Sequence, residues 1–320
     1  MSAIPMSWIT PVMARWTRIL ALRTAGLLSV LMVVFAAVAL LPGSSAAAVL
    51  GRDAAPAQVS AYTAAMGLNR PLPVRFWSWL TGLLRGDLGT SLRGASINDM
   101  LAAKFPNTLL LAGTALGVTT IAATVVGSWW FLHPRGPARL LGPGTTAAVA
   151  VPEFVTATML VSVFALGLEW LPAVTVTDAT GAPADATSLV LPVLALAIPQ
   201  SAWNIRVTRA ALEEAGGLPH VDAARLDGFS ERHILARHVL PLAAPTIAAS
   251  LATSVGMLLG GAVVVEAVFN YPGIGSVLAG SMSDRDSAVA AAVVALTGTA
   301  ITAVLILADL VRDWSLRGQR

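Results

Sequence analysis

Two acidic residues lie at long apolar stretches of this sequence, where an ionised side chain is costly. Glu153 follows Pro152 in a run from Leu140 to Leu168 that contains no other charged residue, and Glu266 comes directly after the charge-free run Val239–Val265. A charge at the centre of a bilayer costs about 2.5–3.5 kcal/mol on insertion scales. We therefore expect Glu153 to face a cavity or a partner, either in a substrate path or as a helix-packing contact. Glu266 is a second candidate for such a path.

Residue types that perform catalysis or hold metals are scarce. The chain has no cysteine, which excludes disulfides and thiolate metal sites. Its four histidines lie in or beside predicted loops, and His233 and His238 lack the spacing of metal ligands on one helical face. No Gly-x-Ser-x-Gly motif is present, and Lys104, the only lysine, belongs to no Gly-x-x-x-x-Gly-Lys phosphate loop. The sequence predicts neither an enzyme nor a resident metal or cofactor.

The composition indicates whether the segments that carry these residues lie in water or in lipid. The chain has 320 residues, of which 56% are hydrophobic and 12% charged, and its mean hydropathy is +0.75. Soluble domains carry about 25% charged residues, so we predict an integral membrane protein in contact with the lipid bilayer. The formal net charge is only +3, and the basic residues are scattered between apolar blocks. This pattern favours membrane topology over nucleic-acid binding.

Gaps between charged residues predict six transmembrane helices. Each gap supplies the roughly 20 residues that a helix needs to cross the hydrocarbon layer. Because lipid cannot satisfy backbone hydrogen bonds, a spanning segment of this kind must be helical. The predicted fold class is therefore all-α. The apolar segments are Gly26–Leu41, Phe105–Leu132, Leu140–Leu168, Ala186–Ile205, Val239–Val265 and Ser287–Ala308.

The first span has an alternative interpretation as a cleaved signal peptide. Three arginines, Arg15, Arg18 and Arg23, precede it, and the small residues from Ala46 to Ala48 follow it. The apolar stretch is longer than a typical signal core, and the chain continues as a membrane protein. We therefore favour a transmembrane helix.

An even number of spans places both termini on one side of the membrane. Most of the 20 Lys and Arg residues fall on that side, and most of the others fall in one long loop, which the positive-inside rule discounts. We predict a multi-pass protein of the cytoplasmic (inner) membrane with both termini cytoplasmic. The expected organisation is an N-terminus at 1–23, one transmembrane domain at 24–311 with an external loop at 42–104 and a cytoplasmic loop at 206–241, and a tail at 312–320.

The predicted cytoplasmic loop combines small residues, charges and turn formers over a short stretch. The run Asp222-Ala223-Ala224 can begin one short helix, and Ser230 is a good N-cap for a second helix that starts at Glu231. Gly228 lies between them and permits a sharp turn with positive φ. On physical grounds alone the loop is as consistent with a solvated connector, because helix–turn–helix loops are common.

Several motifs resemble those of the oligopeptide, dipeptide and nickel permease family of ABC importers, specifically its B-type subunit. The run Asp222-Ala223-Ala224, three further residues, Gly228 and later Leu240-Pro241 are similar to the EAA loop of importer permeases. Asp222 stands in place of the usual Glu, and His238 in place of the usual Ile. Ser44 departs from the family after Leu41-Pro42-Gly43, where Asp is usual. Four other segments spread the resemblance along nearly the whole chain: Gly67–Pro73, Leu84–Gly89, Gly260–Glu266 and Phe269–Gly275.

The resemblance implies the architecture of a type I ABC importer permease and a division of labour. In such systems two related permease subunits form the pathway, and two cytoplasmic ATPases, which bind ATP and Mg²⁺, drive it. An external substrate-binding protein delivers the substrate, and the EAA loop sits in a groove on an ATPase. The residues implied for this loop are Asp222, Ala223, Ala224, Arg225, Gly228, Glu231, Arg232, Leu240 and Pro241.

The function that the resemblance implies is import of short peptides into the cytoplasm by alternating access. Import of nickel or a metal chelate by the same architecture is the alternative within the family. An ion-coupled secondary transporter that uses Glu153 is an alternative from another class, although such a transporter would have no use for a projecting loop. An intramembrane enzyme would need a nucleophile–base pair or a metal set, which the sequence does not offer.

Overall fold

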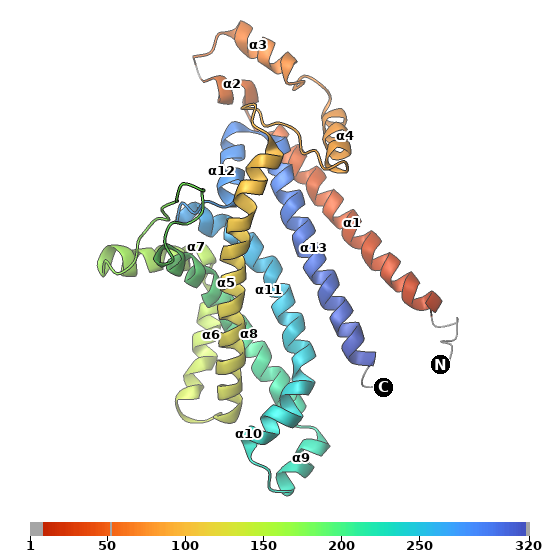
Figure 1. Cartoon of the computed structure of the whole chain (residues 1–320), viewed down its shortest axis with the longest axis vertical. Coiled ribbons are helices and arrows are strands. Elements are labelled where there is room, and N and C mark those ends of the chain that lie inside the picture. Colours follow the sequence, from red (N-terminus) through yellow and green to blue (C-terminus); the bar gives the residue numbers. More distant parts are fainter. Residues whose placement is uncertain (1–8, 52, 318–320) are drawn as a thin grey trace. The chain divides into compact units, whose positions relative to one another are not determined.

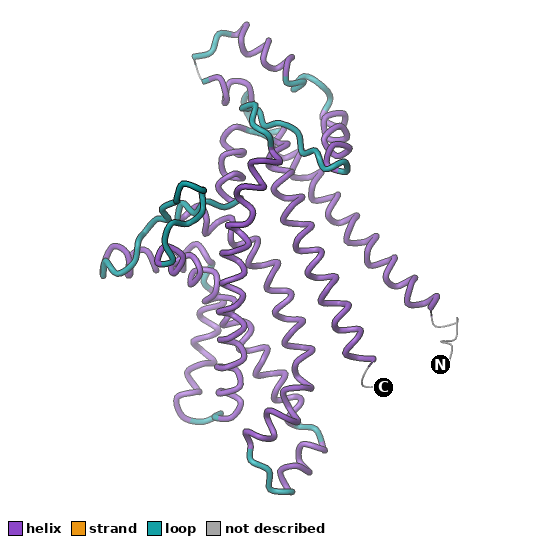
Figure 2. The backbone as a smooth tube through the Cα atoms, in the orientation of Figure 1, coloured by secondary structure: helices purple, strands orange, loops and turns teal. Residues whose placement is uncertain are grey.

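The chain is built of helices joined by loops. The computed structural model describes residues 9–51 and 53–317 (Figure 2). Within these residues the only β-structure is two isolated bridges. This confirms the all-α prediction. Arg52 and the outer ends of the two predicted cytoplasmic termini, residues 1–8 and 318–320, lie outside the described residues.

Two compact units make up the chain. The first comprises the residues up to Leu101 together with Val277–Thr302, and the second comprises Ala102–Ser276 together with the residues from Ala303 onward. The long helices α5 (Ile97–Leu132) and α13 (Ser287–Arg317) and the short helix α12 (Ile274–Asp284) each contribute to both units.

In the first unit, aromatic packing joins α1 (Ile9–Ala39) to α4 (Leu72–Leu83). The ring of Phe35 on α1 lies 5.6 Å from that of Phe76 and 5.8 Å from that of Trp79, measured between ring centroids. All three side chains are buried. The chain between these helices forms α2 (Ser45–Leu50) and α3 (Pro56–Ala65).

Two neighbouring aspartates hold the loop that follows α4. Asp286 accepts a hydrogen bond from the Leu92 N–H at 2.6 Å and caps the start of α13 by accepting two more from its first turn. Asp284 pairs with Arg93 at 2.5 Å. Burial raises the pKa of Asp286, whereas the hydrogen bond from Arg93 lowers the pKa of Asp284.

In the second unit, α8 (Thr187–Gly216) is the central helix. It packs against α6 (Leu141–Ala150), α7 (Glu153–Leu160) and α11 (Leu240–Val268) (Figure 1). Asn204 of α8 is 1% exposed; its amide donates to Ser254 Oγ at 2.8 Å, and its carbonyl accepts from Ser250 Oγ at 2.8 Å. Such interhelical hydrogen bonds between polar side chains are a usual means of joining helices inside a membrane.

The described residues contain five helices long and apolar enough to cross a membrane. A sixth candidate, the predicted third span, is a pair of helices bent by 102°. Pro152 explains the break, because it lacks an N–H and forces the residue before it out of helical geometry; Val151 has φ −85° and ψ 120°. Counting the pair as one span gives the predicted six. The candidates are Trp16–Ala39, Ile97–Leu132, Thr187–Gly216, Glu231–Val268 and Ser287–Leu310, with the bent pair Ala138–Ala150 and Glu153–Gly167.

The span ends differ from the predicted ones on the loop side. The helix expected to end at Ile205 continues to Gly216, and the helical stretch expected to begin at Val239 already begins at Glu231. Charged residues do not stop a helix once it leaves the apolar layer, so the charge gaps marked only the apolar parts. The remaining segments are short: η2 (Gly136–Leu140), η3 (Val161–Gly167), α9 (Pro219–Leu226), α10 (Glu231–Ile234) and η4 (Leu235–Val239).

Candidate functional site

One short helix, α9, and a glycine turn join α8 to the helical stretch that begins at Glu231 and continues through α10 and η4 into α11 (Figure 1). The sequence predicts the turn and the helix start at Glu231, but α9 begins at Pro219 rather than at Asp222, and α10 is the start of the long helix rather than a separate one. Pro219 begins α9, and Ser230 caps α10 by accepting a hydrogen bond from the His233 N–H. Gly228 has a φ of +83° between the two helices. A glycine is needed there because residues with a Cβ rarely adopt this conformation.

The loop is packed onto the ends of the two long helices. Its apolar side chains and those of α8 and α11 form one buried cluster, which joins the loop to both helices and contains Ala211, Leu212, Ala215, Val221, Ala224, Ile234, Val239, Ala243 and Ile247. The two alanines of the motif therefore differ, since Ala224 is buried in this cluster and Ala223 is exposed. Leu240 packs against the same cluster, and Pro241 lies in the first turn of α11.

Arg225 ties three parts of the loop together. Its guanidinium donates to the Gly216 carbonyl oxygen at 3.1 Å and to Asp222 Oδ1 at 2.8 Å, and its Nε lies 3.4 Å from Glu231 Oε1. Three of the four charged residues that the resemblance implies for this loop thus bind one another. Arg232 is exposed, and no ion pair of its side chain is present within the described part of the chain.

Two exposed apolar side chains stand on either side of the glycine turn, and sequence reasoning missed them. Leu226 is 90% exposed and Phe229 is 49% exposed. The Phe229 ring stacks on His233, with centroids 5.0 Å apart and planes inclined by 15°. The signal that could have found them is an apolar residue near each side of a glycine in an otherwise charged loop. Large exposed apolar patches mark contact sites in proteins, and these two side chains supply apolar area at the tip of the loop.

Glu153 lines a cavity. The cavity has a volume of about 260 Å³ and lies at the break between α6 and α7, where Gln200, Trp203 and Met257 also line it. Glu153 is half-buried, and its carboxylate has no hydrogen-bond partner among the described residues. The side-chain oxygen of Gln200 is buried and likewise has none within that part of the chain. The role of Glu153 in a substrate path stays a prediction.

Glu266 is fully buried, and both of its carboxylate oxygens are occupied. Oε1 accepts from Thr108 Oγ1 at 2.6 Å, and Oε2 accepts from the Gly275 N–H at 2.5 Å. The Thr108 hydroxyl in turn accepts from the Ile274 N–H at 3.0 Å. The carboxylate therefore binds the first turn of α12, where the unpaired N–H groups of a helix favour a negative charge.

The turn that follows Glu266 is fixed by polar side chains of α5. The Tyr271 hydroxyl donates to the backbone carbonyl oxygen of Asn107 at 2.8 Å, and the side-chain amide of Asn107 donates to the backbone carbonyl oxygen of Pro272 at 2.8 Å. Burial raises the pKa of Tyr271. A Cβ on Gly275 would lie 2.7 Å from the Val263 carbonyl oxygen, so this glycine is required by close packing. Glu266 and the motif Phe269–Gly275 thus form one buried structural unit.

Comparisons with known proteins agree along almost the whole chain. Residues 120–320 match the family described as binding-protein-dependent transport system inner membrane component, and residues 16–112 match the corresponding N-terminal family. The chain is 32% identical over 287 residues to the glutathione transport system permease protein GsiC of Pectobacterium atrosepticum, which covers 89% of this chain and 91% of that protein. It is also 32% identical over 298 residues to a Brucella suis protein whose name describes it as a candidate peptide permease, with 89% and 92% covered.

The fold has a counterpart among solved structures. A chain from the inward-facing methionine ABC transporter MetNI superimposes with a TM-score of 0.55 at 15% identity, covering 68% of this chain and 96% of that one. The present chain belongs to the family of binding-protein-dependent transport system inner membrane components, the membrane-spanning permeases of ABC importers. It is a multi-pass membrane protein with the fold of a type I importer permease. Permeases of this kind work with an ATPase and a substrate-binding protein and are not themselves the catalytic component.

Proposed function

We propose that this chain is a permease subunit that carries short peptides into the cytoplasm. The observation that carries the substrate class is its similarity, over 89% of its length, to permeases named for glutathione or for peptides. Glutathione is itself a short peptide, so both names point to the same chemistry. In the described part of the chain no group of three or more His, Cys, Asp or Glu side chains could hold a metal ion. A permease does not have to hold its cargo at a fixed metal site, so nickel or a metal chelate is kept as the alternative substrate, which the uptake test below distinguishes.

The loop at 206–241 is proposed to couple transport to ATP hydrolysis. In this proposal it lies in the cytoplasm with both termini, and its tip enters a groove on the ATPase. The buried cluster that joins the loop to α8 and α11 supports this role, because a displacement of the tip must then move both helices. The exposed Leu226 and Phe229 supply apolar contact area at the tip, and the bonds of Arg225 keep its shape.

The proposed assembly contains a second, related permease subunit, two cytoplasmic ATPases that hold ATP and Mg²⁺, and an external binding protein. The loop at 42–104 then lies outside the membrane and faces the binding protein. ATP-driven closure of the two ATPases would pull the coupling loops together and reorient the spans between outward-open and inward-open states.

Within the membrane, Glu153 is the proposed polar contact of the substrate path. Its carboxylate has no hydrogen-bond partner among the described residues and shares a cavity with the unpaired amide oxygen of Gln200. Two such acceptors match the ammonium end of a peptide. Glu266 was predicted for the same path, but its saturated hydrogen bonds support a role in holding the Phe269–Gly275 turn instead.

The coupling proposal is tested with the complete transporter in vesicles, comparing Gly228→Trp with Gly136→Trp. Gly136 also has a positive φ, of +75°, and open space around it, but it lies outside the loop. Uptake of labelled glutathione, a dipeptide, a longer peptide and nickel is measured together with ATP hydrolysis. We expect Gly228→Trp to abolish peptide uptake and Gly136→Trp to retain it. Equal uptake by the two variants would remove the coupling role, and uptake of nickel alone would move the substrate assignment to nickel.

The path proposal is tested by Glu153→Gln and Glu153→Lys. The control is Glu169→Gln, because Glu169 is exposed and lies outside both the cavity and the loop at 206–241. A positive charge in the cavity should repel the peptide ammonium end, so Glu153→Lys should impair uptake more than Glu153→Gln. Normal uptake by both variants would show that Glu153 has only a structural role.

A further inference from the structure

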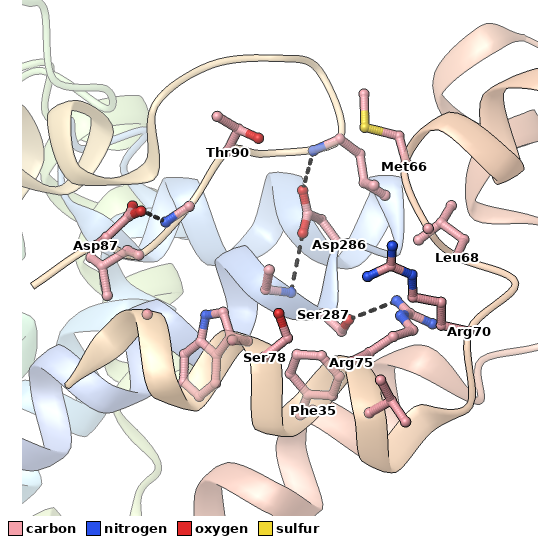
Figure 3. A pocket seen from close by; sticks show the side chains of 18 residues that line it. Phe35, Met66, Leu68, Arg70, Arg75, Ser78, Asp87, Thr90, Asp286 and Ser287 are labelled. Atoms are coloured by element: carbon pink, nitrogen blue, oxygen red, sulfur yellow. Dashed lines mark hydrogen bonds between the residues drawn. The ribbon is translucent and has the colours of Figure 1, made fainter. Parts of the chain in front are cut away.

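A cavity of about 360 Å³ lies in the first unit, where the loops before and after α4 meet the start of α13 (Figure 3). Two of the segments that resemble the permease family, Gly67–Pro73 and Leu84–Gly89, lie on opposite sides of α4 in the sequence, yet both line this cavity. The coupling mechanism uses neither of them. The residues that they contribute are Gly67, Leu68 and Arg70 from the first and Asp87, Leu88 and Gly89 from the second.

Two guanidinium groups are directed into this cavity (Figure 3). Arg75 is half-buried; its guanidinium carbon lies 5.9 Å from the Phe35 ring centroid, and its Nη2 donates to Ser287 Oγ at 3.4 Å. Arg70 is exposed, and its guanidinium has no hydrogen-bond or ion-pair partner in the described part of the chain. Most of the N–H groups of both arginines are therefore free to bind a ligand, since a guanidinium carries five of them.

The two carboxylates that line the cavity do not neutralise these arginines by pairing. Asp286 accepts three hydrogen bonds from backbone N–H groups, which hold the loop at Leu92 and the start of α13. Asp87 accepts from the Gly89 N–H at 2.8 Å. Within the described residues, neither acid forms an ion pair with Arg70 or Arg75.

A third donor in the lining also lacks a partner. Trp79 is 9% exposed, and its indole N–H is buried without a hydrogen-bond acceptor in the described part of the chain. An indole N–H can only donate, and buried donors are nearly always satisfied. Because this N–H is shielded from solvent, the unused donors that a ligand can reach are those of the two arginines, both of which carry a positive charge.

We propose that this cavity is a binding site for a carboxylate group, held by Arg70 and Arg75. A guanidinium binds a carboxylate through two parallel hydrogen bonds, a geometry that a single ammonium cannot provide. The volume is at the lower end of the range of ligand pockets, about 300–1,000 Å³, and fits one acidic residue. The proposal rests on the proposed function, because the orientation proposed there places the cavity outside the membrane. The carboxylate can come from an acidic side chain of the binding protein or from the C-terminus of a peptide substrate.

The test uses the complete transporter in nanodiscs without ATP, with variants Arg70→Gln, Arg75→Gln and Arg75→Lys. Arg85→Gln is the matched control, because Arg85 is exposed in the same segment and does not line the cavity. Arg75→Lys keeps the charge but not the planar fork, and the exposed Arg70 can be replaced without disturbing the fold. One arm measures binding of a tripeptide with a free C-terminal carboxylate and of the same tripeptide with a C-terminal amide. The other arm measures binding of the substrate-binding protein.

In each cavity variant we expect the affinity measured in at least one arm to fall about tenfold or more, which corresponds to about 1.4 kcal/mol. In Arg85→Gln the affinity should stay unchanged. A loss confined to the free-carboxylate tripeptide identifies the substrate as the source, and a loss confined to the binding protein identifies its acidic side chain. If both arms are unchanged in all three variants, the cavity is not a carboxylate site. Peptide uptake by the wild type is measured in parallel, so a failure of peptide import is seen separately from a failure of this site.

Discussion

Two glycine-containing turns of the second unit, at Gly228 and at Gly275, need glycine for different reasons. At Gly228 the backbone adopts a φ of +83°, and a Cβ would meet nothing within 4 Å. At Gly275 a Cβ would lie 2.7 Å from the carbonyl oxygen of Val263 and 2.7 Å from a carboxylate oxygen of Glu266. The first turn is exposed and held by ion pairs, whereas the second is buried and held by neutral and charged hydrogen bonds. A motif glycine can therefore mark either a turn that meets a partner or a turn that closes a core.

The largest loss of stability should come from a side chain introduced at the buried turn. Gly275→Ala should cost about 2–3 kcal/mol, because the atoms in contact include main chain that cannot move aside. Thermal unfolding of the purified chain in detergent measures the loss. Gly280→Ala is the control, since a Cβ there meets nothing within 4 Å. Equal melting temperatures for the two variants would show that the buried turn is not tightly packed.

Replacing the carboxylate of Glu266 by an amide should cause the next largest loss of stability. In Glu266→Gln the amide oxygen can accept from Thr108 or from Gly275 but not from both, which leaves a buried donor unpaired at a cost of about 1–3 kcal/mol. Glu213→Gln, on the exposed surface of α8, should cost less than about 1 kcal/mol. Denaturation of both variants under the same conditions compares them. A loss no larger in Glu266→Gln than in Glu213→Gln would contradict the anchoring role.

At the exposed turn, the expected loss of stability is smaller and depends on the residue introduced. Gly228→Ala should cost about 1–2 kcal/mol through the positive φ, and Gly228→Asn should cost less, because Asn tolerates this conformation. At Gly275 neither Ala nor Asn should be tolerated. Stability and peptide uptake, measured for Ala and Asn at both positions, separate backbone strain at Gly228 from close packing at Gly275. If Gly275→Asn were as stable as Gly228→Asn, the distinction between the turns would be lost.

The smallest effect is expected from Arg225→Gln. Exposed ion pairs contribute about 0.2–1 kcal/mol and are screened by salt, so stability should fall slightly at low ionic strength and not at high ionic strength. Uptake per ATP hydrolysed is the more sensitive readout, because it depends on the shape of the loop. Equal coupling in Arg225→Gln and wild type at low salt would mean that the buried cluster alone fixes the loop.

The exposed turn could be predicted from the sequence because its signals are local. Ser230 lies three residues before the N–H that it caps, and Gly228 lies within the turn that needs it. The buried turn could not be predicted in this way. Glu266 bonds Thr108, which is 158 residues away in the sequence, and no local pattern indicates such a partner. Its place beside an apolar run suggested a path, although a buried carboxylate can be satisfied equally well by backbone N–H groups and a hydroxyl.

The third span shows the same limit. Pro152 marks in the sequence where a helix can break, and the structure has the break at this proline. The bend of 102° depends on how α7 packs against α8 and α11, which the sequence near Pro152 does not encode. The exposure of Leu226 was missed for a related reason, since an apolar residue in a loop is as often a core residue as a contact residue.

The break at Val151 and Pro152 has a consequence for hydration. The last carbonyl groups of α6 and the first N–H groups of α7 have no partners within their own helices, and lipid can offer them none. Backbone of this kind is tolerated at membrane depth only where it is covered by protein or lines a water-filled space, and the 260 Å³ cavity lies beside it. The middle of this span should therefore hold water, and its amide hydrogens should exchange with solvent faster than those in the middle of α8.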